Sequence, residues 1–108
     1  WHQMGNCGRI MIGSYCHHFH HINVCPECKF EGIAVIRSVN KAFSIHGTSK
    51  TNVSHNVIHN HRGASIYLEN GQEYGNLISH NMITCEYMSS GYYGKCSLRD
   101  SVPTHFHN

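Results

Sequence analysis

The sequence has little charge and no clustered basic residues. Charged residues make up 13% of the 108 residues, with eight lysines and arginines and six acidic residues. The basic residues are scattered singly, so no basic run of the kind that binds nucleic acid phosphates is present. With 40% apolar residues the chain is also too uncharged and too apolar for a disordered tail. A folded domain is therefore expected, without a nucleic acid partner.

Long apolar runs and helical spacing are also missing. No stretch approaches the roughly 18 apolar residues that cross a bilayer, so no membrane span is expected in this segment. Apolar residues do not recur at intervals of three and four beyond a single turn. β-Branched and aromatic residues, with Asn and Gly, outnumber the residues that favour helices. These features predict an all-β fold.

One short phrase occurs twice in the second half of the chain. Residues 54–58 read Ser-His-Asn-Val-Ile and residues 79–83 read Ser-His-Asn-Met-Ile, 25 residues apart. The Ser-Ile pairs at 44–45 and 65–66 give a second offset of 21. A unit of strands and turns that recurs at this spacing is typical of a solenoid, and favours it over a sandwich or barrel of hairpins. The sequence predicts a right-handed parallel β-helix of about four coils, with the hand taken from the rule for parallel crossovers.

The predicted domain is one β-helix section over residues 1–108, part of a longer solenoid. Residues 1–32 are expected to form a short buried strand at 10–12 and a loop that carries a His/Cys cluster. Residues 86–108, rich in Tyr and Gly, are expected to form an end or cap. The coils between them, residues 33–85, should contain strands bounded by Asn, His and Gly: 33–36, 42–45, 52–58, 64–68 and 77–83.

The repeated asparagines, Asn56 and Asn81, have an expected structural role. If they occupy the same corner of successive coils, their amides can hydrogen-bond to each other along the axis. Asn also tolerates the left-handed backbone that a sharp corner needs. The two apolar residues after each Asn should join the core.

Cysteine usage indicates an extracellular or cell-surface protein. Six cysteines in so short a chain favour an oxidising compartment and disulfides, although six allow fifteen pairings. Asn52-Val53-Ser54 is an N-glycosylation pattern, which makes Asn52 a candidate glycosylation site. The disulfide candidates are Cys7, Cys16, Cys25, Cys28, Cys85 and Cys96.

Three motifs in order resemble the β-helix region of the fibrocystin family, whose extracellular relatives include transmembrane and secreted hyaluronan-degrading proteins. They are residues 42–48 (Ala-Phe-Ser-Ile-His-Gly-Thr), residues 52–57 (Asn-Val-Ser-His-Asn-Val) and residues 62–71 (Arg-Gly-Ala-Ser-Ile-Tyr-Leu-Glu-Asn-Gly). The match continues through Glu73, Gly75 and Asn76 and covers roughly residues 41–85. The resemblance implies a β-helix and a cell-surface setting.

Two departures from the family pattern bear on catalysis. Ala64 stands where the pattern has His, and Asn70 stands where it has Asp, so a potential proton carrier and a carboxylate are missing. If the chain is nevertheless a polysaccharide-degrading enzyme, the resemblance and the residue chemistry point to His46, Arg62 and Glu69. Glu69 would act as general acid, and Arg62 would hold a sugar carboxylate.

A metal site is the third hypothesis. Cys25 and Cys28 have the spacing of half a zinc site, and His18 and His20 lie just before them. No second pair follows at zinc-finger spacing, so disulfides are favoured and no cofactor is expected.

Together these features predict a non-catalytic structural or adhesive segment that contacts carbohydrate along one face. Its expected partners are neighbouring β-helix coils or protein subunits in a larger assembly, and extracellular polysaccharide.

Overall fold

The computed structural model describes residues 1–9, 11 and 13–84, and in these residues it has ten strands and no α-helix. Every strand pair is parallel, and the strands form three sheets in the orders β1-β4-β7-β10, β2-β5-β8 and β3-β6-β9. The strands are β1 (His2–Gly5), β2 (His17–Val24), β3 (Lys29–Glu31), β4 (Ile33–Ser38), β5 (Phe43–Ser49), β6 (Asn52–Ser54), β7 (Val57–His61), β8 (Ile66–Leu68), β9 (Leu77–Ser79) and β10 (Met82–Thr84).

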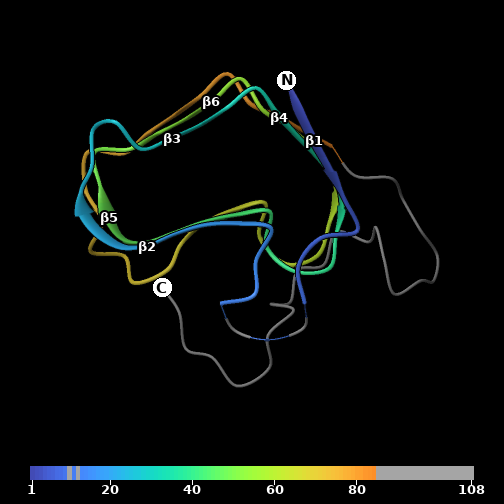
Figure 1. The fold of residues 1–108 in the computed structure, drawn as a ribbon, viewed down its shortest axis with the longest axis horizontal. Helices are drawn as coiled ribbons and strands as arrows, with labels where there is room; N and C mark the ends of the chain where they lie inside the picture. The colour runs from blue at the N-terminus through green and yellow to red at the C-terminus, as the bar shows by residue number, and fades with distance from the viewer. Residues whose placement is uncertain (10, 12, 85–108) are drawn as a thin grey trace.

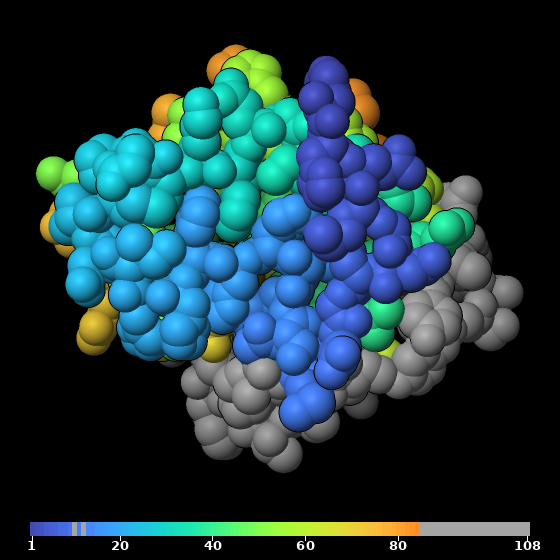
Figure 2. Space-filling model, viewed as in Figure 1, coloured from blue at the N-terminus to red at the C-terminus, as the bar shows by residue number. Residues whose placement is uncertain are grey.

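The chain visits the three sheets in turn, so each sheet forms one side of a three-sided stack. In Figure 1, β3 and β6 run along one side, β1 and β4 along the second, and β2 and β5 along the third. The space-filling view in Figure 2 has the first of these circuits, coloured blue to cyan, in front of the later ones. This all-β stack of parallel sheets is consistent with the predicted β-helix.

The register confirms one predicted offset and corrects the other. Ser54 lies beside Ser79, 25 residues later, as the repeated phrase predicts. In the second sheet, however, Ser44 lies beside Tyr67 rather than Ser65, so the offset there is 23 and not 21. The reason is that Phe43 pairs with Ile66, which keeps apolar side chains stacked on one face.

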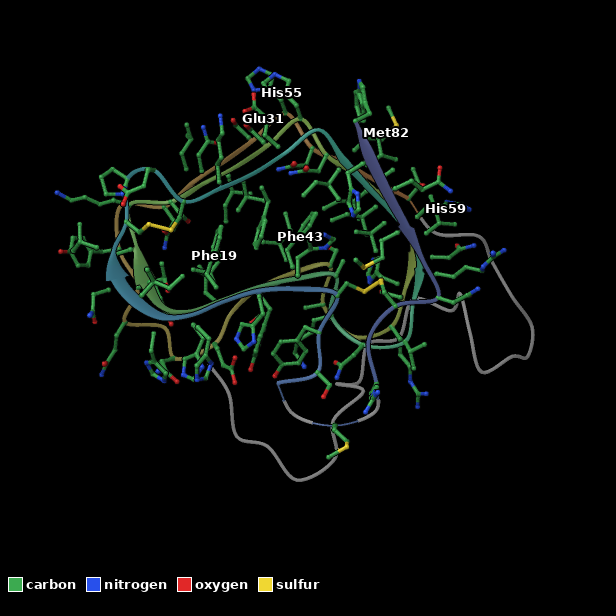
Figure 3. All side chains as sticks on the ribbon, in the orientation of Figure 1. Phe19, Glu31, Phe43, His55, His59 and Met82 are labelled. Carbon is green, nitrogen blue, oxygen red and sulfur yellow. A yellow bond between two sulfur atoms is a disulfide. The ribbon has the colours of Figure 1, made fainter. Side chains whose placement is uncertain are left out.

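The segments predicted as single strands at 52–58 and 77–83 are each broken by a corner. His55 (φ 56°) and His80 (φ 55°) have the left-handed backbone that turns the chain from the third sheet to the first, and Gly32 (φ 69°) does so one coil earlier. The left-handed residue is therefore the His and not the following Asn, which corrects the prediction. The two rings stack in parallel, 5.0 Å apart, and Figure 3 shows His55 on the outside of the corner.

The asparagine ladder is confirmed. The Nδ2 group of Asn56 donates to Oδ1 of Asn81 at 3.0 Å and to the carbonyl of Phe30 at 2.9 Å. Its Oδ1 accepts from the backbone N–H of Ile33 at 2.9 Å. Asn56 thus bridges three successive coils and leaves no polar side-chain atom unpaired.

The other corners use asparagine in a similar way. The Oδ1 atom of Asn76 accepts from the backbone N–H and the hydroxyl of Thr51, at 2.8 and 2.7 Å. The Nδ2 group of Asn40 donates to the carbonyls of Arg9 and Met11, at 2.8 and 3.0 Å. Asparagine therefore satisfies backbone groups that the sheets leave unpaired.

The core lies between the three sheets and contains Phe30, Val35, Ala42, Phe43, Ile45, Val53 and Ile58. The rings of Phe19 and Phe30 stack with centroids 3.9 Å apart, and Figure 3 shows Phe19 and Phe43 pointing inward. Ile58 joins the core as predicted and Val57 is half-buried, but Met82 and Ile83 are 62% and 45% exposed, contrary to the prediction. Their strand, β10, pairs with β7 alone among the described strands.

The first 32 residues are more regular than the sequence indicates. Met11 is exposed and lies in a bend, not in the buried strand predicted at 10–12, and residues 10 and 12 lie outside the described residues. The histidine cluster, predicted as a loop, forms strand β2. The neighbouring strand β5 pairs with β2, and this pairing cannot be predicted from the local sequence of β2.

The first circuit is also longer than the others. His2 pairs with Ile33, an offset of 31, whereas Ala34 pairs with Val57, an offset of 23. Five of the eight extra residues lie between β1 and β2, where a disulfide joins Cys7 to Cys16, because His17 pairs with Phe43 at an offset of 26. The other three lie in β2 and in the turn that follows it, because Lys29 pairs with Asn52 at an offset of 23.

Two predictions concern other parts of the chain. The expected end or cap at 86–108 lies outside the described residues. Within the described part, no helix is long and apolar enough to cross a membrane.

Candidate functional site

The outer face of the second sheet carries a cluster of histidines around one buried carboxylate. His18 and His20 are two residues apart on β2, so their side chains project from the same face. His46 on β5 lies beside His20 in the register, and Glu69 follows β8 with its N–H bonded to the carbonyl of Ile45. Three strands therefore bring these groups together.

Glu69 is 3% exposed and is surrounded by polar groups. Its Oε2 accepts from the hydroxyl of Ser44 at 3.3 Å and lies 3.4 Å from Nδ1 of His46 and 3.6 Å from Nε2 of His18. Its Oε1 accepts from the hydroxyl of Tyr15 at 3.5 Å. The ring nitrogens are at ion-pair distances, too long for good hydrogen bonds.

Burial shapes the electrostatics of this cluster. It lowers the pKa of His18 below the ordinary value, the Glu69 carboxylate acts to raise that pKa, and His20 and His46 lower it further. The net effect favours a neutral imidazole, which is the form that binds metals.

A buried lysine lies near the same face. Lys41 is 1% exposed, and its Nζ lies 5.1 Å from the ring centroid of Tyr15 and 4.6 Å from that of Tyr67. Two aromatic faces thus stabilise its charge by cation–π attraction. Because Tyr15 also donates to Glu69, it connects the cation to the carboxylate.

A groove of about 250 Å³ lies next to the cluster. Its side chains are mostly polar, and it includes the exposed ring of Tyr74. Glu73 forms part of the wall, and its Oε1 accepts from the N–H of Gly47 at 2.9 Å and of Asn70 at 3.3 Å. Burial acts to raise the pKa of Glu73, but these and other backbone N–H groups outweigh it and hold the pKa below its ordinary value. The lining residues are Asn23, Val24, Gly47, Ser49, Asn70, Gln72, Glu73 and Tyr74.

A β-bulge joins the cluster to the groove. The register of β2 and β5 shifts between His20 and Asn23, so two residues of β2 face one residue, Gly47, of β5. Gly47 has φ 56°, and the ring of His21 occupies the space where a Cβ would lie. Bulges of this kind redirect side chains next to sites.

The residues predicted for an enzyme are only partly brought together. His46 and Glu69 are in contact, as the enzyme hypothesis requires. Arg62, however, precedes β8 whereas Glu69 follows it, so the two residues lie at opposite ends of that strand. Glu73, and not Glu69, is the carboxylate that accepts hydrogen bonds from backbone N–H groups in this region. Glu69 lies beside the imidazoles of His18 and His46.

The cysteines predicted as metal ligands are bonded to each other. Cys25 and Cys28 form a disulfide, so their sulfurs cannot bind a metal as thiolates in this structure. Cys7 and Cys16 form a second disulfide, and Cys85 and Cys96 lie outside the described residues. His18 and His20, the two histidines of the predicted metal set, lie close to His46 and not to cysteine thiolates.

Asn52 begins β6 and is half-buried, and its glycosylation stays a prediction. The sequence does not predict that His46 lies near His18 and His20, because these residues are 26 to 28 positions apart and meet only through the pairing of β2 with β5. The alternation His18-x-His20 is typical of one strand face and was the available signal.

Comparisons with known proteins agree with this architecture. The family described as CEMIP beta-helix matches residues 2–107. Fibrocystin-L of Mus musculus is 31% identical over 72 residues, which are 66% of this chain and 2% of that protein. Protein rliB of Dictyostelium discoideum is 34% identical over 74 residues, 68% of this chain and 7% of that protein. A G8 domain-containing protein of the same organism is 36% identical over 70 residues, 65% of this chain and 5% of that protein.

This chain spans only 2–7% of the length of these relatives. No solved structure matches it. The family match extends over nearly the whole chain, well beyond residues 41–85, where the motifs lie. The chain belongs to the CEMIP β-helix family.

Proposed function

We propose that this chain is an extracellular or cell-surface section of a right-handed parallel β-helix of about four coils, with a structural and adhesive role and no catalysis. Three observations support this proposal: the three stacked parallel sheets, the two disulfides, and the much greater length of the relatives. The hand follows the rule for parallel crossovers.

The partner along the axis is a following β-helix coil. Ile78 stacks on Val53 and Ile83 stacks on Ile58. Val53 and Ile58 are fully buried, whereas Ile78 and Ile83 are 41% and 45% exposed. A following coil in the same register would bury these two residues as completely as their counterparts.

The single observation that carries the adhesive part is the groove. Its amides, hydroxyl and carboxylate offer the hydrogen-bond groups that sugars need, and the 57% exposed ring of Tyr74 offers a face for a sugar ring. The ligand class is an extracellular polysaccharide.

Calorimetric titration with hyaluronan and chondroitin oligosaccharides tests this role. We expect binding that Tyr74→Ala weakens about fivefold, since a stacked ring contributes about 1 kcal/mol. Trp1→Ala is the matched control, because Trp1 is 90% exposed and is not part of the groove. Absence of binding, or equal loss in both variants, contradicts the carbohydrate role.

Contact between His46 and Glu69 favours one alternative, a polysaccharide-degrading enzyme. Incubating the protein with hyaluronan and measuring chain length distinguishes the two functions. We expect no shortening. Shortening that Glu69→Gln abolishes would establish the enzyme and reject the non-catalytic proposal.

A further inference from the structure

Three imidazoles on the outer face of the second sheet converge on one point. The ring nitrogens that His18, His20 and His46 can offer lie within 4.8 Å of one another. Ligands of a tetrahedral zinc ion are about 3.3 Å apart for bonds of about 2.05 Å. Side-chain rotations can close this difference, because the register of β2 and β5 already places the three residues on one face.

The nitrogens that face inward need a partner. Nε2 of His18 and Nδ1 of His46 are buried, and within the described residues neither makes a hydrogen bond. Buried polar atoms are nearly always bonded, and an exception can mark the place of a bound water or ion. Both atoms point toward Oε2 of Glu69, at 3.6 and 3.4 Å.

The negative charge of Glu69 suits a cation at this place. Its carboxylate is nearly fully buried, and Ser44 and Tyr15 orient it through their hydroxyls. A carboxylate this close to two ligand nitrogens strengthens binding by its attraction to the ion. It also compensates the charge that a divalent ion brings into a half-buried site.

We propose that His18, His20 and His46 bind one zinc ion, with the Glu69 carboxylate beside it to balance its charge. The ligands are nitrogen atoms, which suit zinc, whereas calcium and magnesium require oxygen ligands. The site uses two histidines of β2 and one of β5, so a bound ion would fasten the first coil to the second. This zinc site does not depend on the proposed binding of carbohydrate in the groove.

Calorimetry on the full chain tests the site. The protein is purified without reductant, treated with EDTA, dialysed and titrated with Zn²⁺, and with Ca²⁺ and Mg²⁺ as comparisons. We expect one zinc per chain and no heat from the other two ions. Replacing zinc with Co²⁺ should give the visible d–d absorption of a four-coordinate site with nitrogen ligands. Absence of a one-to-one step overturns the proposal.

Substitutions assign the ligands. We expect His46→Ala and His20→Ala each to weaken binding more than 100-fold, and Glu69→Gln to weaken it by about 10–100-fold. His20 is exposed, so His20→Ala should fold even if His46→Ala does not, and circular dichroism checks both. His55→Ala is the matched control, because His55 lies at the corner between the third and first sheets, away from the cluster. This substitution should leave the affinity unchanged. Unchanged affinity in His20→Ala, or an equal loss in His55→Ala, overturns the assignment.

Discussion

The corner between the third and first sheets and the outer face of the second sheet are built on opposite principles. At the corner, the same residues recur one coil later: Asn56 is followed by Asn81, and the rings of His55 and His80 stack. On the second sheet the repeat breaks: His20 lies beside His46, but Glu69 takes the place of a third histidine in the next coil, and His18 lies beside Ser44.

The difference separates what forms the scaffold from what forms the site. Repetition satisfies backbone groups in an identical way in each coil, so every amide of the ladder has a partner. The face where the repeat breaks brings a carboxylate and imidazoles together without completing their hydrogen bonds. Positions where the repeat breaks are therefore where specific chemistry is to be sought.

The largest expected effect is at the corner. Asn56→Ala removes the partners of the Ile33 N–H and the Phe30 carbonyl, and it should lower the free energy of unfolding by about 3 kcal/mol. Urea denaturation measures this change. Asn52→Ala, in the neighbouring strand, should lower it by less than about 1 kcal/mol. Equal losses would mean that the ladder contributes nothing specific.

A glycine comparison addresses the bulge. Gly32 and Gly47 both have positive φ, so replacing either with Ala should cost about 1–2 kcal/mol in unfolding free energy. Gly47→Ala should cost about 1 kcal/mol more, because its Cβ would meet the ring of His21, whereas nothing lies within 4 Å of a Cβ at Gly32. Zinc affinity should fall in Gly47→Ala alone. Equal stability and equal affinity in the two variants would show that the bulge does not shape the site.

The smallest expected effect is on pH dependence. Burial lowers the pKa of His61, although its Nδ1–H donates to the carbonyl of Gly63, which acts to raise it. The unfolded chain therefore binds a proton more readily, and the stability contributed by neutral His61 is present above about pH 6.5 and is lost as the pH falls toward the lowered value. Urea midpoints measured in EDTA should be lower at pH 5.5 than at pH 7.5.

His61→Gln should reduce this pH dependence, and His55→Gln, at an exposed position, serves as its control. The lowered pKa of Glu73 acts in a separate, more acidic window: its contribution is present above about pH 4.5 and is lost as the pH falls further. A midpoint at pH 5.5 equal to or higher than that at pH 7.5 would contradict the assignment to His61.

The sequence predicted the scaffold where the scaffold repeats. The phrase Ser-His-Asn gave the correct 25-residue register and the hydrogen bond between Asn56 and Asn81. The prediction from the sequence failed where the coils differ, as in the offset of 21 that the two Ser-Ile pairs indicate for the second sheet. There the stacking of Phe43 on Ile66 determines the register, and matching serine to serine misplaces it by two residues.

The candidate site was predictable only in fragments. His46 with Glu69, and His18 with His20, were each identified from the sequence, but in two different hypotheses. Their convergence depends on the pairing of β2 with β5, which joins residues about 26 positions apart. No local pattern contains that information, because strand pairing between coils is a property of the whole stack.

The loop closed by Cys7 and Cys16 has a consequence for how such chains vary. The first circuit has eight more residues than the next one, five of them between β1 and β2, and its strands still stay in register with their neighbours. The stack therefore depends on strand register and not on circuit length, so the turn between β1 and β2 can accept an insertion. A peptide or small domain inserted between β1 and β2 should project from the side of the stack and leave the register of the neighbouring coils unchanged.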